Sequence, residues 1–186
     1  PLVVSLANTG EPLFLVNRSG NRPSHELAEV YLDRAIALCR RGGFRKVTLR
    51  GDTKFTQTKY LDRWDSESIR FIFGVGVGWD EAEFDDLRLA FRERGRLSDD
   101  YLRAIKAAWA SDVPEYRGGY VSFGGATFSP RPAQRPHPPI WVGGAPGGVS
   151  APAVRRAAEL GDAWHPLGLG LDDIEKGYAT LRDLAS

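Results

Sequence analysis

The sequence predicts an α/β fold, and three observations support this prediction. Residues 139–184 alternate strand-like and helix-like patterns, as parallel α/β units do. Two apolar strands end in glycine-rich turns, at residues 74–78 and 143–144. Residues 1–52 follow the order hairpin, helix, strand. The 186 residues are 42% hydrophobic and 26% charged, which indicates a globular rather than a disordered chain.

The first part of the chain has the periodicities of short strands and amphipathic helices. Apolar runs on both sides of a polar turn predict a hairpin. Five apolar residues then recur at helical spacing, and two glycines stop this pattern. The elements expected here are a hairpin, a helix, a strand leading to Asp52 and a second helix, at residues 2–16, 27–38, 46–49 and 56–64.

The second part repeats strand and helix. A run of valine and glycine predicts a buried strand, and a long apolar stripe predicts a helix broken near Gly95. A small hairpin and a proline-rich connection separate these elements from the last units. The elements expected are strands at 69–77, 139–142 and 163–165, helices at 80–109, 151–160 and 172–184, and a hairpin at 120–128.

Composition limits the classes of function. No apolar run reaches about 18 residues, so we expect no membrane span. Cys39 is the only cysteine, which fits a reducing cytoplasm, and we expect a cytoplasmic protein. The three histidines lack zinc-ligand spacing. Because the chain contains no methionine and begins at Pro1, we expect a fragment of a longer reading frame.

Asp52 ends a predicted strand among polar neighbours, where a carboxylate can hold a divalent cation. Taken alone, Gly51-Asp52-Thr53 is more often a turn closed by an Asx hydrogen bond. Residues 1–73 hold 12 basic and 8 acidic residues, and residues 74–186 hold 13 and 16. This asymmetry fits a polyanionic partner for the first segment only, and ordinary surface variation explains it equally well.

Residues 1–73 resemble DDE-type transposases of bacterial insertion sequences, on the runs at 1–11, 15–26 and 49–53. The resemblance implies a partial RNase H-like segment with DNA as its partner. It also implies that Asp52 is the second acid of the catalytic triad and a ligand of Mg²⁺. The first Asp of the family would precede residue 1, and no counterpart of its Glu is expected after residue 74.

Gly76 and Gly78 follow an apolar strand, where the missing Cβ lets a ligand approach the backbone, and Trp79 could wall the pocket. Gly143 and Gly144 form a second strand exit before a helix, whose free N–H groups can hold a phosphate. Tight structural turns are the alternative explanation of both. Two exits in one parallel α/β series favour a cofactor site at the carboxyl ends of the strands.

Residues 74–186 resemble the luciferase-like monooxygenase family, in particular its coenzyme F420-dependent branch. The matching runs are residues 74–84, 91–96, 128–132, 136–144 and 161–166. The resemblance implies a partial (β/α)8 TIM-barrel segment that binds reduced F420 or FMN and acts on a small organic substrate. Gly76, Gly78 and Trp79 would line the ring side of the pocket, and Gly143 and Gly144 the phosphate side. His165 is the candidate acid or base near a strand end, with a packed or solvent-facing role as the alternative.

Three hypotheses follow. The first is an oxidoreductase that transfers hydride or activates oxygen, and we expect it to be inactive as a truncated chimera. The second is a transposase fragment for metal-dependent DNA strand transfer. The third is a recombination or assembly product without function, because residues 70–74 (RFIFG) fit both families and could be the seam. We take the oxidoreductase as the principal interpretation.

Overall fold

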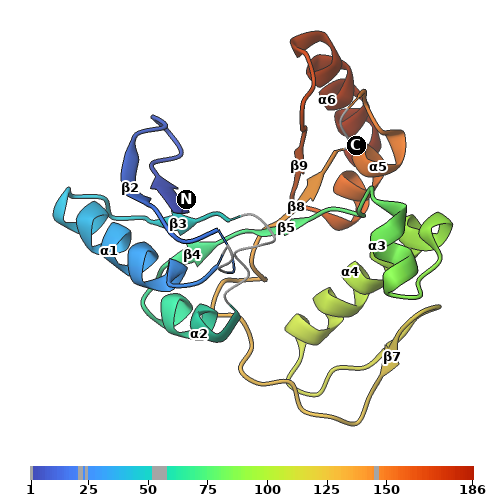
Figure 1. Cartoon of the computed structure of the whole chain (residues 1–186). Helices are drawn as coiled ribbons and strands as arrows, with labels where there is room; N and C mark the ends of the chain where they lie inside the picture. The colour runs from blue at the N-terminus through green and yellow to red at the C-terminus, as the bar shows by residue number, and fades with distance from the viewer. Residues whose placement is uncertain (1, 21–22, 24, 52–57, 145–146) are drawn as a thin grey trace. The chain divides into compact units, whose positions relative to one another are not determined.

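The chain divides into two compact units, Pro1–Phe71 and Ile72–Ser186 (Figure 1). The computed structural model describes residues 2–20, 23, 25–51, 58–144 and 147–186. The boundary expected from the sequence, between residues 73 and 74, lies two residues further along the chain. The separate origin of residues 1–73 remains a prediction.

The first unit contains an antiparallel hairpin, two helices and a parallel pair of short strands. Gly10 closes the hairpin turn with a φ of 72°, and its N–H donates to the carbonyl of Leu6 over 2.8 Å. The expected order of hairpin, helix and strand is observed, but this order alone does not identify an RNase H-like domain. The elements are β1 (Leu2–Ser5), β2 (Pro12–Val16), α1 (Ala28–Arg41), β3 (Thr48–Leu49), α2 (Thr58–Ser66) and β4 (Arg70–Phe71).

A small core holds the first unit together. Ile36 of α1, Trp64 of α2 and Ile69 are buried against one another, and the apolar faces of both helices pack around them. Trp64 is 2% exposed, so its indole N–H needs a partner inside the protein. Asp33 of α1 supplies this partner, since its Oδ1 accepts from Trp64 Nε1 over 2.7 Å.

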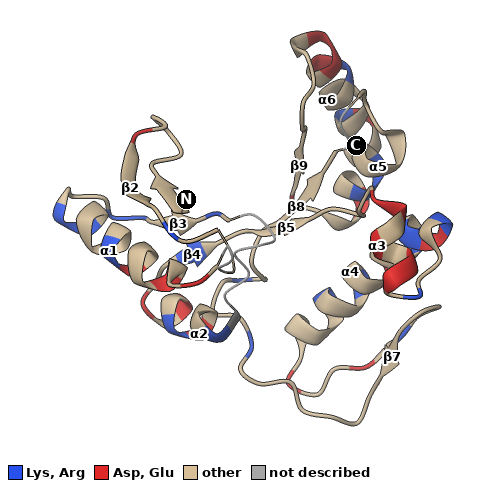
Figure 2. Cartoon of the chain, viewed as in Figure 1, with Lys and Arg blue, Asp and Glu red and all other residues tan. Residues whose placement is uncertain are grey.

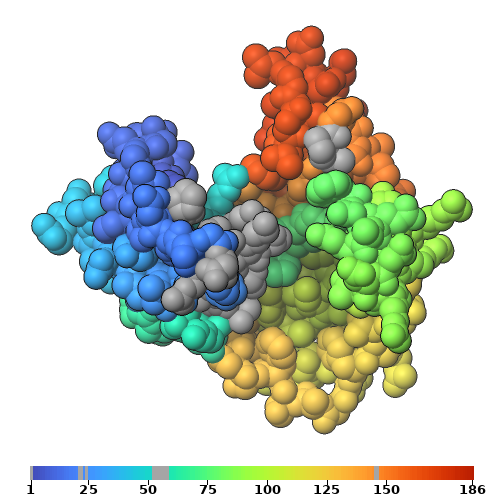
Figure 3. All heavy atoms as spheres, in the orientation of Figure 1, coloured from blue at the N-terminus to red at the C-terminus, as the bar shows by residue number. Residues whose placement is uncertain are grey.

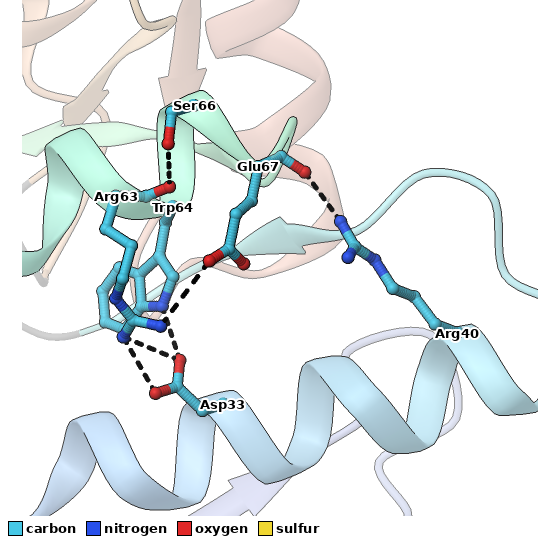
Figure 4. A network of polar contacts seen from close by, with 6 residues as sticks. All are labelled: Asp33, Arg40, Arg63, Trp64, Ser66 and Glu67. Atoms are coloured by element: carbon cyan, nitrogen blue, oxygen red, sulfur yellow. Dashed lines mark hydrogen bonds and ion pairs between the residues drawn. The ribbon is translucent and has the colours of Figure 1, made fainter.

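Asp33 also links α1 to α2 through Arg63 (Figure 4). The guanidinium donates to both carboxylate oxygens of Asp33, over 3.0 and 2.8 Å. Arg40 adds a second tie between the elements, from its Nη2 to the carbonyl of Glu67 over 2.7 Å. The Asp33–Arg63 pair is about 40% exposed and contributes little by itself. The buried bond to Trp64 is therefore the important one.

The second unit is built on a three-stranded parallel sheet in the order β5–β8–β9. The strands are β5 (Phe73–Val75), β8 (Ile140–Gly143) and β9 (Ala163–His165). The last two are followed by α5 (Ala151–Leu160) and α6 (Leu171–Ala185), as the sequence predicts. A long connection joins β5 to β8 through α3 (Glu81–Asp86), a 3₁₀ turn (Phe91–Glu93), α4 (Arg94–Ala110) and the hairpin β6 (Tyr116–Arg117) with β7 (Ser122–Phe123).

The core of the second unit surrounds the central strand. Its buried members come from α4, β8, α5 and β9: Leu102, Ile140, Val142, Val154, Ala157, Leu160 and Trp164. Gly177 of α6 is buried, and an added Cβ there would overlap the ring of Trp164. Helix α6 can therefore approach β9 only because residue 177 has no side chain. The described sheets are small, and none of them closes into a barrel.

Three sequence-based expectations need correction. The single strand expected at residues 69–77 is two strands, β4 and β5, which pair in different sheets. The long helix is broken as expected, but at residues 87–93 rather than at Gly95, and Arg88 adopts a left-handed φ of 56° after α3. The second hairpin lies earlier than the expected residues 120–128, since β6 and β7 pair over residues 116–123 and enclose residues 118–121. Each difference results from pairing or local backbone conformation that periodicity does not report.

We expect Asp33→Ala to destabilise the contact between α1 and α2 by about 1–3 kcal/mol, because it leaves the buried indole N–H of Trp64 unpaired. Asp33→Asn keeps an acceptor oxygen and should cost less. Native-state hydrogen exchange of the amides in α1 and α2 measures the free energy of opening.

Asp62→Ala is the matched control, because Asp62 is exposed on α2 and has no partner among the described residues. Equal protection in the Asp33→Ala and Asp62→Ala variants would contradict the role given to Asp33.

Candidate functional site

The parallel register brings the two predicted glycine exits to one edge of the second unit. Val75 pairs with Val142, and Gly143 pairs with His165. Gly76 leaves β5 at the same edge where Gly143 ends β8, because carboxyl ends of parallel strands share an edge. The structure therefore brings together the two sequence-predicted groups, residues 76–79 and 143–144.

The exit after β5 combines open backbone with an exposed indole. A Cβ on Gly76 would meet nothing within 4 Å, so the absence of a side chain there is not required by packing. Gly78 has a φ of 80°, and a Cβ there would lie 2.7 Å from the ring of Phe84, so this glycine has a structural reason. Trp79 is 81% exposed, which leaves its ring face open to a ligand. Figure 3 shows the green atoms around α3, which follow this exit, at the surface.

The exit after β8 leaves less space for a side chain than Gly76 of the exit after β5 does. A Cβ on Gly143 would lie 3.3 Å from the carbonyl oxygen of Val75, and one on Gly144 would lie 3.3 Å from Nε1 of Trp164. Trp164 is 4% exposed, and this Nε1 has no hydrogen-bond acceptor among the described residues. A buried donor without a partner is uncommon. Residue 144 thus lies beside a buried donor that has no partner among the described residues.

The start of α5 offers less to an anion than the sequence predicts. Pro152 has no N–H, and the N–H groups of Ala153 and Val154 both donate to the carbonyl of Ser150, over 2.9 and 3.0 Å. These donors are already used within the first turn. The indole of Trp164, which the sequence-based interpretation did not include, is the clearer donor near Gly144.

Charge differs between the two exits. Helix α3 begins directly after Trp79 and carries four acidic and no basic residues (Figure 2). Asp80 caps it by accepting from the N–H of Ala82 over 3.1 Å. This helix makes the surroundings of Trp79 unfavourable for a phosphate. The edge beside Gly144 has no such acidic helix next to it in sequence.

The remaining sequence-based site residues have different outcomes. Asp52, predicted as a catalytic acid and metal ligand, lies outside the described residues. Within the described part of the chain, no group of three or more acidic, histidine or cysteine side chains is arranged to hold a metal ion. His165 ends β9 with its ring 5.9 Å from that of Trp141.

None of the described helices is both long and apolar enough to cross a membrane.

Comparison with known families decides the classification. Residues 70–186 match the model of the family described as luciferase-like monooxygenase. This segment is 117 of the 186 residues and contains the whole β5–β8–β9 sheet. The chain belongs to the luciferase-like monooxygenase family.

Curated relatives agree with this classification. The chain is 34% identical over 99 residues to an FMNH₂-dependent dimethylsulfone monooxygenase of Pseudomonas putida, covering 52% of this chain and 26% of the relative. It is 34% identical over 115 residues to an uncharacterized protein of Mycobacterium tuberculosis, covering 62% of this chain and 39% of the relative. The luciferase-like chain therefore spans well under half the length of these relatives.

Two solved structures share the fold. The monooxygenase RslO1 from Streptomyces bottropensis has a TM-score of 0.57 at 24% identity, over 76% of this chain and 43% of that one. An F420-dependent secondary alcohol dehydrogenase has a TM-score of 0.52 at 16% identity, over 68% of this chain and 39% of that one. The 76% of this chain that aligns with RslO1 is longer than the segment 70–186. The aligned part therefore includes residues before position 70. The transposase interpretation of residues 1–73 has no support among these findings.

A buried carboxylate organises the connection between β5 and β8 of the luciferase-like unit. Asp100 of α4 accepts from the hydroxyl of Tyr116 over 2.6 Å and from the N–H groups of Tyr120 and Val121 over 2.8 and 3.0 Å. The hydrogen bond from Tyr116, followed by the backbone donors, lowers the pKa of Asp100, and burial opposes them. The same bond raises the pKa of Tyr116. Through these hydrogen bonds Asp100 holds the hairpin β6–β7 against α4, so its role is structural.

Gly118→Ala should destabilise the second unit by about 1–3 kcal/mol, because the added methyl group would overlap the carboxylate of Asp100. Gly119→Ala is the neighbouring control, since a Cβ there meets nothing within 4 Å and the backbone has no positive φ. Thermal unfolding of the two variants measures the difference. A Gly119→Ala variant as unstable as Gly118→Ala would contradict this explanation.

The stability of the second unit should depend on the ionisation of Asp100. Its pKa is lowered in the folded state, so its contribution is complete above the unfolded value of about 3.9 and is lost as pH falls through the folded value. Unfolding measured from pH 6 to pH 2 should show a smaller acid-induced loss in Asp100→Asn than in the unchanged chain. Asp172→Asn, at an exposed position of α6, should leave the acid-induced loss unchanged.

Proposed function

We propose that the second unit supplies the central part of a flavin- or F420-binding site of an oxidoreductase that acts on a small organic molecule. The observation that carries the proposal is the edge shared by Gly76, Trp79 and Gly144, next to the unsatisfied donor of Trp164. An open glycine, an exposed indole and a buried donor suit a flat cofactor with polar substituents.

The charges favour one orientation of the cofactor. The ring system would lie against Trp79 and the open backbone at Gly76, close to the acidic helix α3. The phosphate-bearing arm would extend toward Gly143 and Gly144, on the side of the buried indole N–H of Trp164. The opposite orientation would bring phosphate charge next to the four carboxylates of α3 and is unfavourable.

The reaction class is supported by relatives and not by a catalytic side chain. When bound, a reduced flavin or F420 supplies a hydride, and a reduced flavin also reacts with oxygen. One relative is an FMNH₂-dependent monooxygenase, and one structure of the same fold is an F420-dependent alcohol dehydrogenase. The residues of this chain would bind and orient the ring and shield one side of it. The expectation of inactivity has no support from these relatives and is not carried forward.

The sequence-based interpretation of the first unit stays outside this proposal. The role of Asp52 as an acid and Mg²⁺ ligand and the partnership with DNA remain predictions from resemblance. The cytoplasmic location remains a prediction from cysteine usage.

Titration of the full chain with FMN and with F420, each followed by its own fluorescence, tests the proposal. We expect saturable binding of one of the two. Gly76→Val should weaken it at least tenfold, because the side chain fits the free protein but fills the space of the ring. Trp79→Ala should weaken it by about threefold to tenfold through lost aromatic contact.

Val113→Ala is the matched control for the loss of an exposed apolar side chain, because Val113 is 55% exposed just after α4. It should leave the dissociation constant unchanged. Failure of both cofactors to bind, or normal binding by both site variants, would refute the proposal.

A further inference from the structure

A cavity lies at the other end of the parallel strands of the second unit. It has a volume of about 340 Å³ and is lined by Lys106, Trp109, Ala110, Arg131, Arg135, Pro136 and His137. The ring of Trp109 packs edge-on against Phe73, the first residue of β5, at 5.7 Å. Residues 135–137 directly precede β8. The cavity therefore lies at the amino ends of β5 and β8, away from the glycine exits.

The two walls of this basic cavity come from segments that are distant in sequence. One is the last turn of α4, and the other is the proline-rich segment before β8. Figure 3 shows the gold atoms of this segment beside the yellow-green atoms of α4. Arg131 ties them together, since it donates to the carbonyl of Ala110 over 3.0 Å and pairs with Asp112 at 2.7 Å.

The cavity carries more positive charge than its surroundings neutralise. Lys106 is half-buried and has no hydrogen bond or ion pair with any described residue. Arg135 donates to the carbonyl of Pro132 over 2.9 Å, a contact that orients the guanidinium without cancelling its charge. Among the described residues, two carboxylates face the lining groups: Asp112 pairs with Arg131 and its side chain is 78% exposed, and Asp162 lies 3.9 Å from Nδ1 of His137. The Nζ of Lys106 is not among the buried atoms without a partner, so it is accessible and can donate a charge-assisted hydrogen bond to an anion.

The other lining groups are flat and apolar. The rings of Trp109 and His137 lie 5.7 Å apart at 33°, and Pro136 adds an apolar surface. The Nδ1 of His137 lies 2.9 Å from the carbonyl of Pro138, which fixes the ring orientation. A bare inorganic anion would leave most of about 340 Å³ unfilled, since a water molecule takes about 30 Å³. An anion with a flat apolar body fits both the walls and the volume.

We propose that this basic cavity binds a small aromatic carboxylate, with its ring against Trp109 and Pro136 and its carboxylate near Lys106, Arg131 and Arg135. The site is separate from the proposed cofactor site and requires no group bound there. Its ligand class follows from a lining that combines three cations with aromatic and proline rings.

Calorimetric titration of the full chain with 2-naphthoate tests this site. We expect saturable binding below about 1 mM, weakened at least fivefold in Lys106→Gln and in Arg135→Gln. Lys106 has no described partner, so Lys106→Gln removes charge without breaking a fold contact. Lys176→Gln on α6 is the matched control, because it removes the same charge at an exposed position, and it should bind normally.

Two further ligands define the chemistry. The neutral 2-naphthamide should bind at least tenfold more weakly than 2-naphthoate, and so should inorganic phosphate. Comparable binding of the amide would overturn the role of charge, and comparable binding of phosphate would overturn the role of the aromatic body. Equal weakening by Lys106→Gln and Lys176→Gln would overturn the location.

The chain has three histidines, so its ring resonances provide an independent reading of location. Signals assigned by single His→Gln substitutions should show that 2-naphthoate shifts His137 but not His25 or His165. A shift of His165 alone would assign the ligand to the glycine edge and refute a separate site. If 2-naphthoate fails to bind while FMN or F420 still binds, the proposal for the basic cavity is wrong and the proposed function is unaffected.

Discussion

The central strand β8 is the constraint on which the second unit depends. Ile140 and Val142 are 0% and 1% exposed, and the strand pairs with β5 on one side and β9 on the other. Asp162 ties the start of β9 to β8 twice, since its carboxylate accepts from the N–H of Ile140 and its own N–H donates to the carbonyl of Ile140, both over 2.8 Å. Once β8 is fixed, Gly143 must end beside Val75, and the glycine edge follows.

Much of this unit could be predicted because its elements are locally encoded. Residues 151–160 and 163–165 have the bounds expected, since apolar periodicity and the glycine at position 161 are sufficient there. The hairpin at 116–123 could not be placed in the same way. Its turn is held by Asp100, which is 20 residues away from Tyr120 in the sequence. This carboxylate lies on a helix distant in sequence, so no local pattern predicts its contact with the turn.

In the candidate site too, some features are visible in the sequence and others depend on contacts between distant residues. The glycines at the strand exits are visible in the sequence, but their reasons differ in the structure. Gly78 is required by a positive φ and Gly144 by a neighbouring indole, whereas Gly76 is free of both. Trp164 could not be found by pattern, because a tryptophan in a buried strand is expected to be a core residue. Only its position beside Gly144 and its unsatisfied Nε1 distinguish it.

The two ends of the β5–β8 pair differ in the charge of the residues around them. At the carboxyl ends, the exit after β5 leads into the acidic helix α3, which would disfavour a phosphate beside Trp79 but not beside Gly143. At the amino ends, the basic cavity is lined by three cations together with Trp109, which would favour a negative charge. Trp109 packs on Phe73, so β5 joins both ends physically. Under both proposals, charge would select the ligand first and the shape of an aromatic surface second.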